Sequence, residues 1–234
     1  MIGTEGTSSQ SESTSDFPAR ESRRYFWAVI VGIVLYVVLD VIAQLLPPHY
    51  SPISQAESDL AVGPYGYVMT VNFVNRGILS LVFLYGLHRI RGAERGSWAN
   101  SRAGFALLGI WGVGALLLAA FPTDVPSTPV SWHGAIHLVV AVLAFIGGGA
   151  GAYVVSTHFK ESDTLREAAS FAIPLGGIAL LLLAVELLAG FIVPRLAADV
   201  GGLTERLFLG SVLLWMFLVS VYLVTRPLPG RSPR

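Results

Sequence analysis

The chain has 234 residues, of which 53% are hydrophobic and only 13% are charged, and it contains no cysteine. A soluble domain needs roughly a quarter of its residues charged to cover its surface, so this composition excludes an ordinary soluble protein. The zero net charge and the missing cysteines also exclude a nucleic-acid-binding domain and a disulfide-stapled secreted module. The composition therefore predicts an integral membrane protein.

The N-terminal segment, residues 1–22, is rich in Ser, Thr and Glu and holds almost no large apolar side chains. Such a segment cannot bury enough surface to offset the entropy of ordering, which predicts a disordered tail. We expect one membrane domain over residues 23–226, followed by a short tail at 227–234.

Six apolar runs follow in chain order, and each is long enough to cross about 30 Å of hydrocarbon as a helix. The predicted spans are 26–46, 65–87, 103–121, 131–157, 168–193 and 207–225. Because backbone polar groups in lipid must be satisfied within the segment, we predict an all-α bundle of six transmembrane helices. Gly147 and Gly151 have the spacing of a GxxxG motif, which favours close packing inside one bundle over a dimer interface.

The basic residues indicate how the bundle is oriented. Of the 15 basic residues, 12 lie before the first span, between the second and third, between the fourth and fifth, or after the sixth. These four segments share one side of the membrane in a six-span protein. The positive-inside rule therefore predicts that both termini are cytoplasmic.

Polar side chains gather in the opposite, outer halves of the spans, where they are costly unless they face the bundle interior or a wet cavity. They come from five spans and from the outer loops: Tyr36, Asp40, Gln44, Glu57, Asp59, Asn72, Asn75, Arg76, Asp124, His133, His137, Glu186, Glu205 and Arg206. Carboxylates outnumber arginines at this level. We predict an acidic, histidine-containing cavity that opens to the extracytoplasmic side and suits a cation or proton chemistry.

His133 and His137 lie one helical turn apart, so both imidazoles share a face and could bind a divalent metal such as zinc. Asp124 or Glu57 would supply a third ligand, and a water of lowered pKa would occupy the fourth position. Structural interpretations stay open beside this one. Arg76 and Glu186 could form an ion pair that ties two helices together, and the Glu205–Arg206 pair could cap a helix.

Several cofactors are not expected. Retinal needs a lysine inside the bundle, whereas the single lysine, Lys160, lies in a predicted loop. Haem needs axial histidines from facing helices, whereas His133 and His137 share one helix. Iron–sulfur clusters need cysteine, and no phosphate-binding fingerprint for a nucleotide is present.

Several motifs occur together in a fixed order: SxxESDL at 54–60, Asn72 and Asn75, FPTD at 121–124, HGxxH at 133–137, and GLxERL at 202–207. With them the chain resembles, over residues 26–225, the six-helix membrane proteins of the domain of unknown function 998 (DUF998) family of archaea and bacteria. The resemblance implies a six-helix fold in a prokaryotic plasma membrane and no assigned activity. The chain also shows a fainter similarity to Frag1/DRAM-like proteins, some of which are linked to remodelling of lipid anchors. This similarity favours a function on lipids at the outer leaflet of the membrane.

Three functions remain open at this stage, and the sequence does not decide whether the protein is an enzyme. The first is a hydrolase or transferase for lipids, with His133, His137 and Asp124 as bases or metal ligands. In this hypothesis Asn72 and Asn75 donate hydrogen bonds to the substrate, and the head group is bound by Arg76, Glu186 and Arg206. The others are a proton or cation transporter and a non-catalytic scaffold. Membrane lipids are the expected partners, nucleic acids are not, and a homo-oligomer is left open.

Overall fold

The computed structural model describes residues 16–47, 50–94, 98, 101–125 and 128–226. The predicted tails at 1–15 and 227–234 lie outside this part of the chain. The helices are α1 (Asp16–Leu45), η1 (Glu57–Ala61), α2 (Gly66–Ala93), α3 (Arg102–Ala120), α4 (Trp132–His158), η3 (Phe159–Glu161), α5 (Ala169–Ile192) and α6 (Pro194–Thr225). The described residues form no strand, which confirms the all-helical fold class.

Six helices are long and apolar enough to cross a membrane, and each coincides with one predicted span. Two helices begin earlier than predicted. α1 begins at Asp16, so residues 16–22, which we expected to be flexible, belong to the helix. α6 begins at Pro194, because the fixed φ of proline suits the first turn of a helix. Glu205 and Arg206 therefore lie inside α6 and do not cap its N-terminus.

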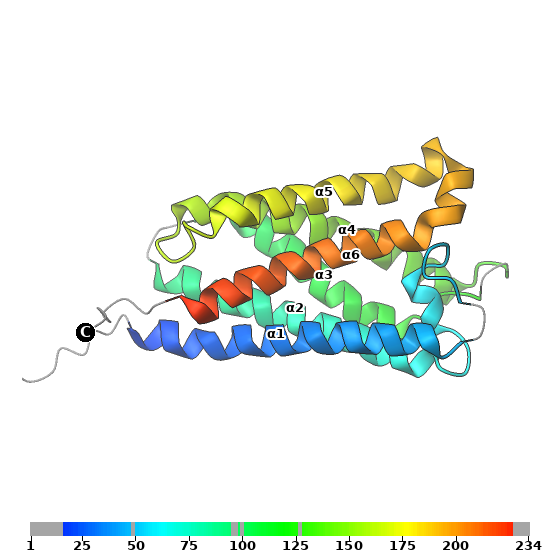
Figure 1. The fold of residues 1–234 in the computed structure, drawn as a ribbon, viewed down its shortest axis with the longest axis horizontal. Helices are drawn as coiled ribbons and strands as arrows, with labels where there is room; N and C mark the ends of the chain where they lie inside the picture. The colour runs from blue at the N-terminus through cyan, green and yellow to red at the C-terminus, as the bar shows by residue number, and fades with distance from the viewer. Residues whose placement is uncertain (1–15, 48–49, 95–97, 99–100, 126–127, 227–234) are drawn as a thin grey trace, which may run out of the picture.

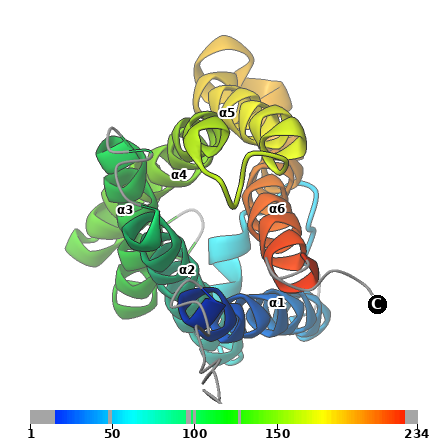
Figure 2. The same ribbon diagram turned by 90° about the vertical axis from the view of Figure 1, so that its left-hand side faces the viewer.

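The six long helices form a closed ring in chain order, in which each contacts the next and α6 returns to contact α1 (Figure 2). α1 begins and α6 ends at the same end of the bundle, which we call the terminal end (Figure 1). The opposite end carries η1, and we call it the η1 end. α1 and α6 are the pair of ring neighbours that are most distant in the sequence.

The GxxxG glycines of α4 allow close contact with α3. A Cβ atom on Gly147 would lie 2.5 Å from the carbonyl oxygen of Leu107, and one on Gly151 would lie 3.0 Å from the backbone nitrogen of Leu108. Real Cβ atoms do not approach backbone this closely, so glycine is required at Gly147 in particular. As predicted, the motif serves packing inside the bundle.

The connection between α1 and α2 does not stay on the surface. Its η1 helix enters the ring at the η1 end, where Figure 2 shows it between α2 and α6. Leu60 is buried in an apolar cluster with Met69 and Phe73 of α2. This anchoring places Glu57, which is only 2% exposed, among α1, α2 and α6. A loop residue thus becomes part of the bundle interior.

Candidate functional site

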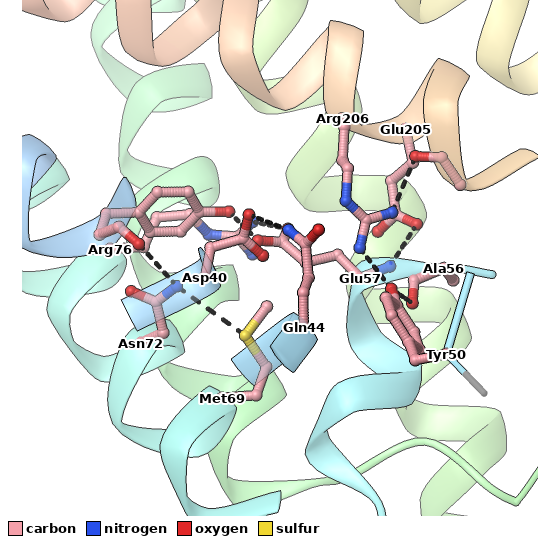
Figure 3. Close-up of polar contacts among 12 residues, drawn as sticks. Asp40, Gln44, Tyr50, Ala56, Glu57, Met69, Asn72, Arg76, Glu205 and Arg206 are labelled. Carbon is pink, nitrogen blue, oxygen red and sulfur yellow. Dashed lines mark hydrogen bonds and ion pairs between the residues drawn. The ribbon is translucent and has the colours of Figure 1, made fainter. Parts of the chain in front are cut away.

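Five charged or hydroxylated side chains from α1, α2 and α6 meet around Glu57 of η1 (Figure 3). We call this group the Glu57 cluster; its members are Tyr36, Asp40, Glu57, Arg76, Glu205 and Arg206. The Tyr36 hydroxyl donates a hydrogen bond to Glu57 Oε1, and the Asp40 carboxyl is also within hydrogen-bonding reach of Glu57. Gln44 Nε2 donates to Asp40 Oδ2 at 2.6 Å, one turn along α1.

Arg76 is the cation on the α2 side of the cluster. Its Nη1 lies 3.9 Å from Glu57 Oε2, and the two side chains are 1% and 2% exposed. The guanidinium also lies 4.9 Å from the ring centre of Trp111 and 5.2 Å from that of Phe73. Arg76 therefore pairs with Glu57 and not with Glu186 as one of our interpretations had it, because η1 brings Glu57 against α2.

Carboxyl groups outnumber guanidinium groups here, as predicted. Glu205 Oε2 accepts a hydrogen bond from the backbone nitrogen of Glu57 at 3.0 Å. Glu186 of α5 is close enough to Glu205 for the two carboxyl groups to interact electrostatically. With Glu186 included, the group thus contains two guanidinium groups, those of Arg76 and Arg206, and four carboxyl groups, those of Asp40, Glu57, Glu186 and Glu205.

Arg206 holds the α1–α2 connection against α6. Its Nη1 donates to the carbonyl oxygens of Pro52, Gln55 and Gly202, each at 3.0 Å, and its Nη2 bonds the Tyr50 hydroxyl. At Gly202 a Cβ atom would lie 2.1 Å from the carbonyl oxygen of Gln55, so only glycine lets the loop approach. Most donors of Arg206, a predicted head-group ligand, are therefore used within the protein.

Burial raises the pKa of Glu57 from its ordinary value of 4.5 to about 7. The positive charge of Arg76 opposes this rise, and the negative charge of Asp40 adds to it. A carboxyl group with a pKa near 7 exchanges its proton readily under physiological conditions, which is the property required of a general acid or base.

The cluster also contains buried polar atoms that have no hydrogen-bond partner among the described residues. They include Asp40 Oδ1, Glu57 Oε2 and Arg206 Nε. An unsatisfied buried polar atom typically costs about 1–3 kcal/mol, so a bound water, ion or ligand group that satisfied these atoms would stabilise the site. The Glu57 cluster thus has hydrogen-bonding capacity that its own residues do not use.

A groove of about 290 Å³ lies between α1 and α6 and ends at this cluster. Its lining residues are Ile33, Tyr36, Val37, Asp40, Glu57, Arg206, Leu209, Gly210, Leu213, Leu214 and Phe217. The apolar part on α6, from Leu209 to Phe217, is about 12 Å long at 1.5 Å per residue. Val37 and Leu214 are 52% and 47% exposed, so the groove opens on the outer face of the ring.

Asn72 and Asn75, the predicted hydrogen-bond donors to substrate, join α2 to α1. Asn72 Nδ2 donates to the carbonyl oxygen of Tyr36 at 3.2 Å, and Asn75 Nδ2 donates to that of Gly32 at 2.9 Å. Both amide groups therefore bond the backbone of the neighbouring helix. Asn72 Oδ1 is left buried without a partner among the described residues.

Asp124 caps the start of α4. Its carboxylate accepts hydrogen bonds from the Ser131 backbone nitrogen at 2.8 Å and from the Ser131 hydroxyl at 2.6 Å. These two bonds lower the pKa of Asp124. Ser131 Oγ in turn accepts from the backbone nitrogen of Gly134 at 3.1 Å, as an N-cap residue does. A Cβ atom on Gly134 would lie 1.8 Å from Asp124 Oδ2, which explains the glycine of the HGxxH motif.

The two histidines of that motif contact the end of α3. His137 Nδ1 lies 2.7 Å from the carbonyl oxygen of Phe121, and His133 Nδ1 lies 3.2 Å from that of Pro122. His133 Nδ1 is also 3.8 Å from Asp124 Oδ1. We call this group the α3–α4 junction. It lies apart from the groove, because none of its residues lines the groove.

No group of three or more His, Cys, Asp or Glu side chains that could hold a metal ion occurs in the described ranges. The FPTD and HGxxH motifs bond each other across the α3–α4 junction, and joining two helix ends explains each contact. The described residues do not bring His133, His137 and Asp124 together as a set of metal ligands, so a metal held by these three residues stays a prediction.

Sequence reasoning missed two parts of the site. Tyr50, which bonds Arg206, was not singled out, because an isolated loop tyrosine carries no pattern. The contact of Glu57 with Tyr36 was also missed, although the spacing of Tyr36, Asp40 and Gln44 does mark the face of α1 that receives Glu57.

A family model described as protein of unknown function (DUF998) matches residues 30–222. The chain belongs to the DUF998 family. The match covers nearly all of the six-helix ring, and with it both the Glu57 cluster and the α3–α4 junction. No curated protein and no solved structure matches this DUF998 protein. The fainter similarity to Frag1/DRAM-like proteins stays a prediction.

Proposed function

We propose that this multi-pass membrane protein binds a membrane lipid in the groove between α1 and α6, with the lipid head group at the Glu57 cluster. The observation that supports the proposal is the composition of the groove: apolar side chains line its length, whereas Tyr36, Asp40, Glu57 and Arg206 line its end. A volume of about 290 Å³ is near the lower bound of small-molecule sites, roughly 300–1,000 Å³, and fits part of one lipid.

The charge distribution supports an orientation for this proposal. Basic residues gather at the terminal end of the bundle, among them Arg23, Arg89, Lys160 and Arg226. By the positive-inside rule this end and both termini are cytoplasmic. The Glu57 cluster is then extracytoplasmic, and the lipid enters sideways from the outer leaflet of a prokaryotic plasma membrane.

The chemistry available to a bound head group also supports catalysis as part of the proposal. Glu57, with its pKa of about 7, is suited to donate or accept a proton beside the head group. Its neighbours Tyr36 and Arg76 could stabilise charge that develops there. The reaction class is hydrolysis or group transfer on the lipid head.

Filling the groove tests the proposal. Gly210 lines it, and a Cβ atom built on Gly210 has nothing within 4 Å, so Gly210→Trp introduces a large side chain without a backbone clash. The matched control is Leu181→Trp in α5, at a position that is 64% exposed and does not line the groove. Lipid that remains bound after detergent purification is measured by native mass spectrometry.

We expect Gly210→Trp to lose bound lipid several-fold, while Leu181→Trp retains the wild-type amount and both variants keep the wild-type melting temperature. Equal lipid content in the two variants would show that the groove is not the binding site. A wild-type protein that retains no lipid would favour the scaffold hypothesis.

A further inference from the structure

The residues at the polar end of the groove carry an excess of negative charge. Asp40 and Glu57 line it, and Arg206 is the only basic residue among the lining side chains. Glu205 and Glu186 lie behind Glu57 and add two carboxyl groups, whereas Arg76 adds one guanidinium. An anionic head group would meet net repulsion here.

The hydrogen-bonding groups at the polar end of the groove offer more free acceptors than free donors. Arg206 is a weak candidate for binding an anion, because its terminal nitrogens donate to three carbonyl oxygens and to the Tyr50 hydroxyl. Its Nε alone has no partner among the described residues. By contrast, Asp40 Oδ1 and Glu57 Oε2 accept no hydrogen bond from the described residues, and the one cation beside Glu57 Oε2 is Arg76 Nη1 at 3.9 Å. The site therefore needs a ligand that brings N–H donors and positive charge.

From this balance we infer that the groove selects lipids whose head group carries a primary ammonium. A primary ammonium brings one positive charge and three N–H donors, which match the carboxyl oxygens of Asp40 and Glu57 that accept no hydrogen bond from the described residues. In an ammonium-bearing phospholipid the phosphate group could accept the remaining donor, Arg206 Nε. A quaternary ammonium has the same charge but no N–H donor and is expected to bind more weakly.

This inference rests on the proposed function, and the experiment separates the two. Purified protein in detergent is titrated with phosphatidylethanolamine, phosphatidylcholine and phosphatidylglycerol of identical acyl chains, and each affinity is measured by native mass spectrometry. We expect phosphatidylethanolamine to bind at least tenfold more tightly than phosphatidylglycerol, with phosphatidylcholine between them.

Asp40→Asn and Glu57→Gln keep the shape of the side chains and each replace an ionisable carboxyl group by a neutral amide. Both are expected to lower the preference for phosphatidylethanolamine over phosphatidylglycerol several-fold. The matched control is Glu161→Gln, an exposed carboxyl at the terminal end of the bundle, which should leave the preference unchanged. Two independent variants keep the test valid if one of them fails to fold.

Each other outcome overturns a definite statement. If the three lipids bind equally and Gly210→Trp blocks all of them, the head-group inference is wrong and the groove function stands. Tighter binding of phosphatidylglycerol would likewise overturn the inference. If Gly210→Trp blocks none of them, the proposed function itself is wrong.

Discussion

Glu57 is the residue on which the contacts of the cluster converge. It bonds Tyr36 of α1, pairs with Arg76 of α2 and donates its backbone N–H to Glu205 of α6. Removing one member of a buried ion pair leaves the other charge uncompensated and typically costs about 3–5 kcal/mol. Glu57 therefore connects three helices, and in the proposed function it also donates or accepts the proton.

The raised pKa of Glu57 gives the folded protein a pH-dependent stability. Between pH 4.5 and about 7 the folded state holds a proton on Glu57 that the unfolded chain releases. The stabilisation is therefore complete below pH 4.5 and is lost as the pH rises through about 7. We expect the melting temperature in detergent to fall between pH 5 and pH 8, corresponding to a free-energy change on the order of 3 kcal/mol.

Glu57→Gln should flatten this pH dependence, because the amide cannot ionise, and Glu161→Gln should leave it as in the wild type. The groups around Glu57 that also bear charge or titrate are Tyr36 and Asp40 of α1, Arg76 of α2, and Glu205 and Arg206 of α6. An unchanged slope in Glu57→Gln would mean that one of the other carboxyl groups carries the effect.

At the scale of the elements, the connection between α1 and α2 is irregular backbone at the edge of the bundle. Irregular backbone is tolerated at membrane depth only where the protein satisfies its polar groups. Arg206 does this for the carbonyl oxygens of Pro52 and Gln55, and the backbone nitrogen of Leu203 donates to the carbonyl oxygen of Ile53 at 2.9 Å. The first turns of the membrane part of α6 thus determine where η1 lies.

The α3–α4 junction provides a second prediction at this scale. Asp124→Ala removes the acceptor for two Ser131 hydrogen bonds and should lower the free energy of unfolding by about 1 kcal/mol, as loss of a helix cap does. Metal chelation should leave the melting temperature unchanged if the junction only joins two helix ends. Stoichiometric zinc in the purified protein that is lost in His133→Ala would instead establish the metal site that the HGxxH spacing predicts.

At the scale of the whole molecule, the proposed orientation can be measured directly because the chain contains no cysteine. A single introduced cysteine is then the sole thiol. Ile53→Cys, at a 54% exposed position of the α1–α2 connection, should react with an impermeant maleimide added to intact cells. Lys160→Cys, at the other end, should react only after permeabilisation; the reverse pattern would invert the proposed topology.

The fold was largely predictable, whereas the site was predictable only in part. Apolar length identifies membrane helices because each span must satisfy its own backbone, so all six were found. The partner of Arg76 was not found, since Glu57 lies in a connection whose path into the bundle depends on Gly202 and Arg206. A polar cavity was predicted, but the apolar course of the groove was missed, because no sequence pattern reports that α1 and α6 are neighbours.

That neighbour relation has a consequence for biogenesis. The ring follows chain order, so α1 meets α6 only after α6 has been made. The contacts that α6 makes to η1 and to the α1–α2 connection, through Glu205 and Arg206, form only at that stage. Closing the ring therefore also completes the groove that we propose as a lipid site.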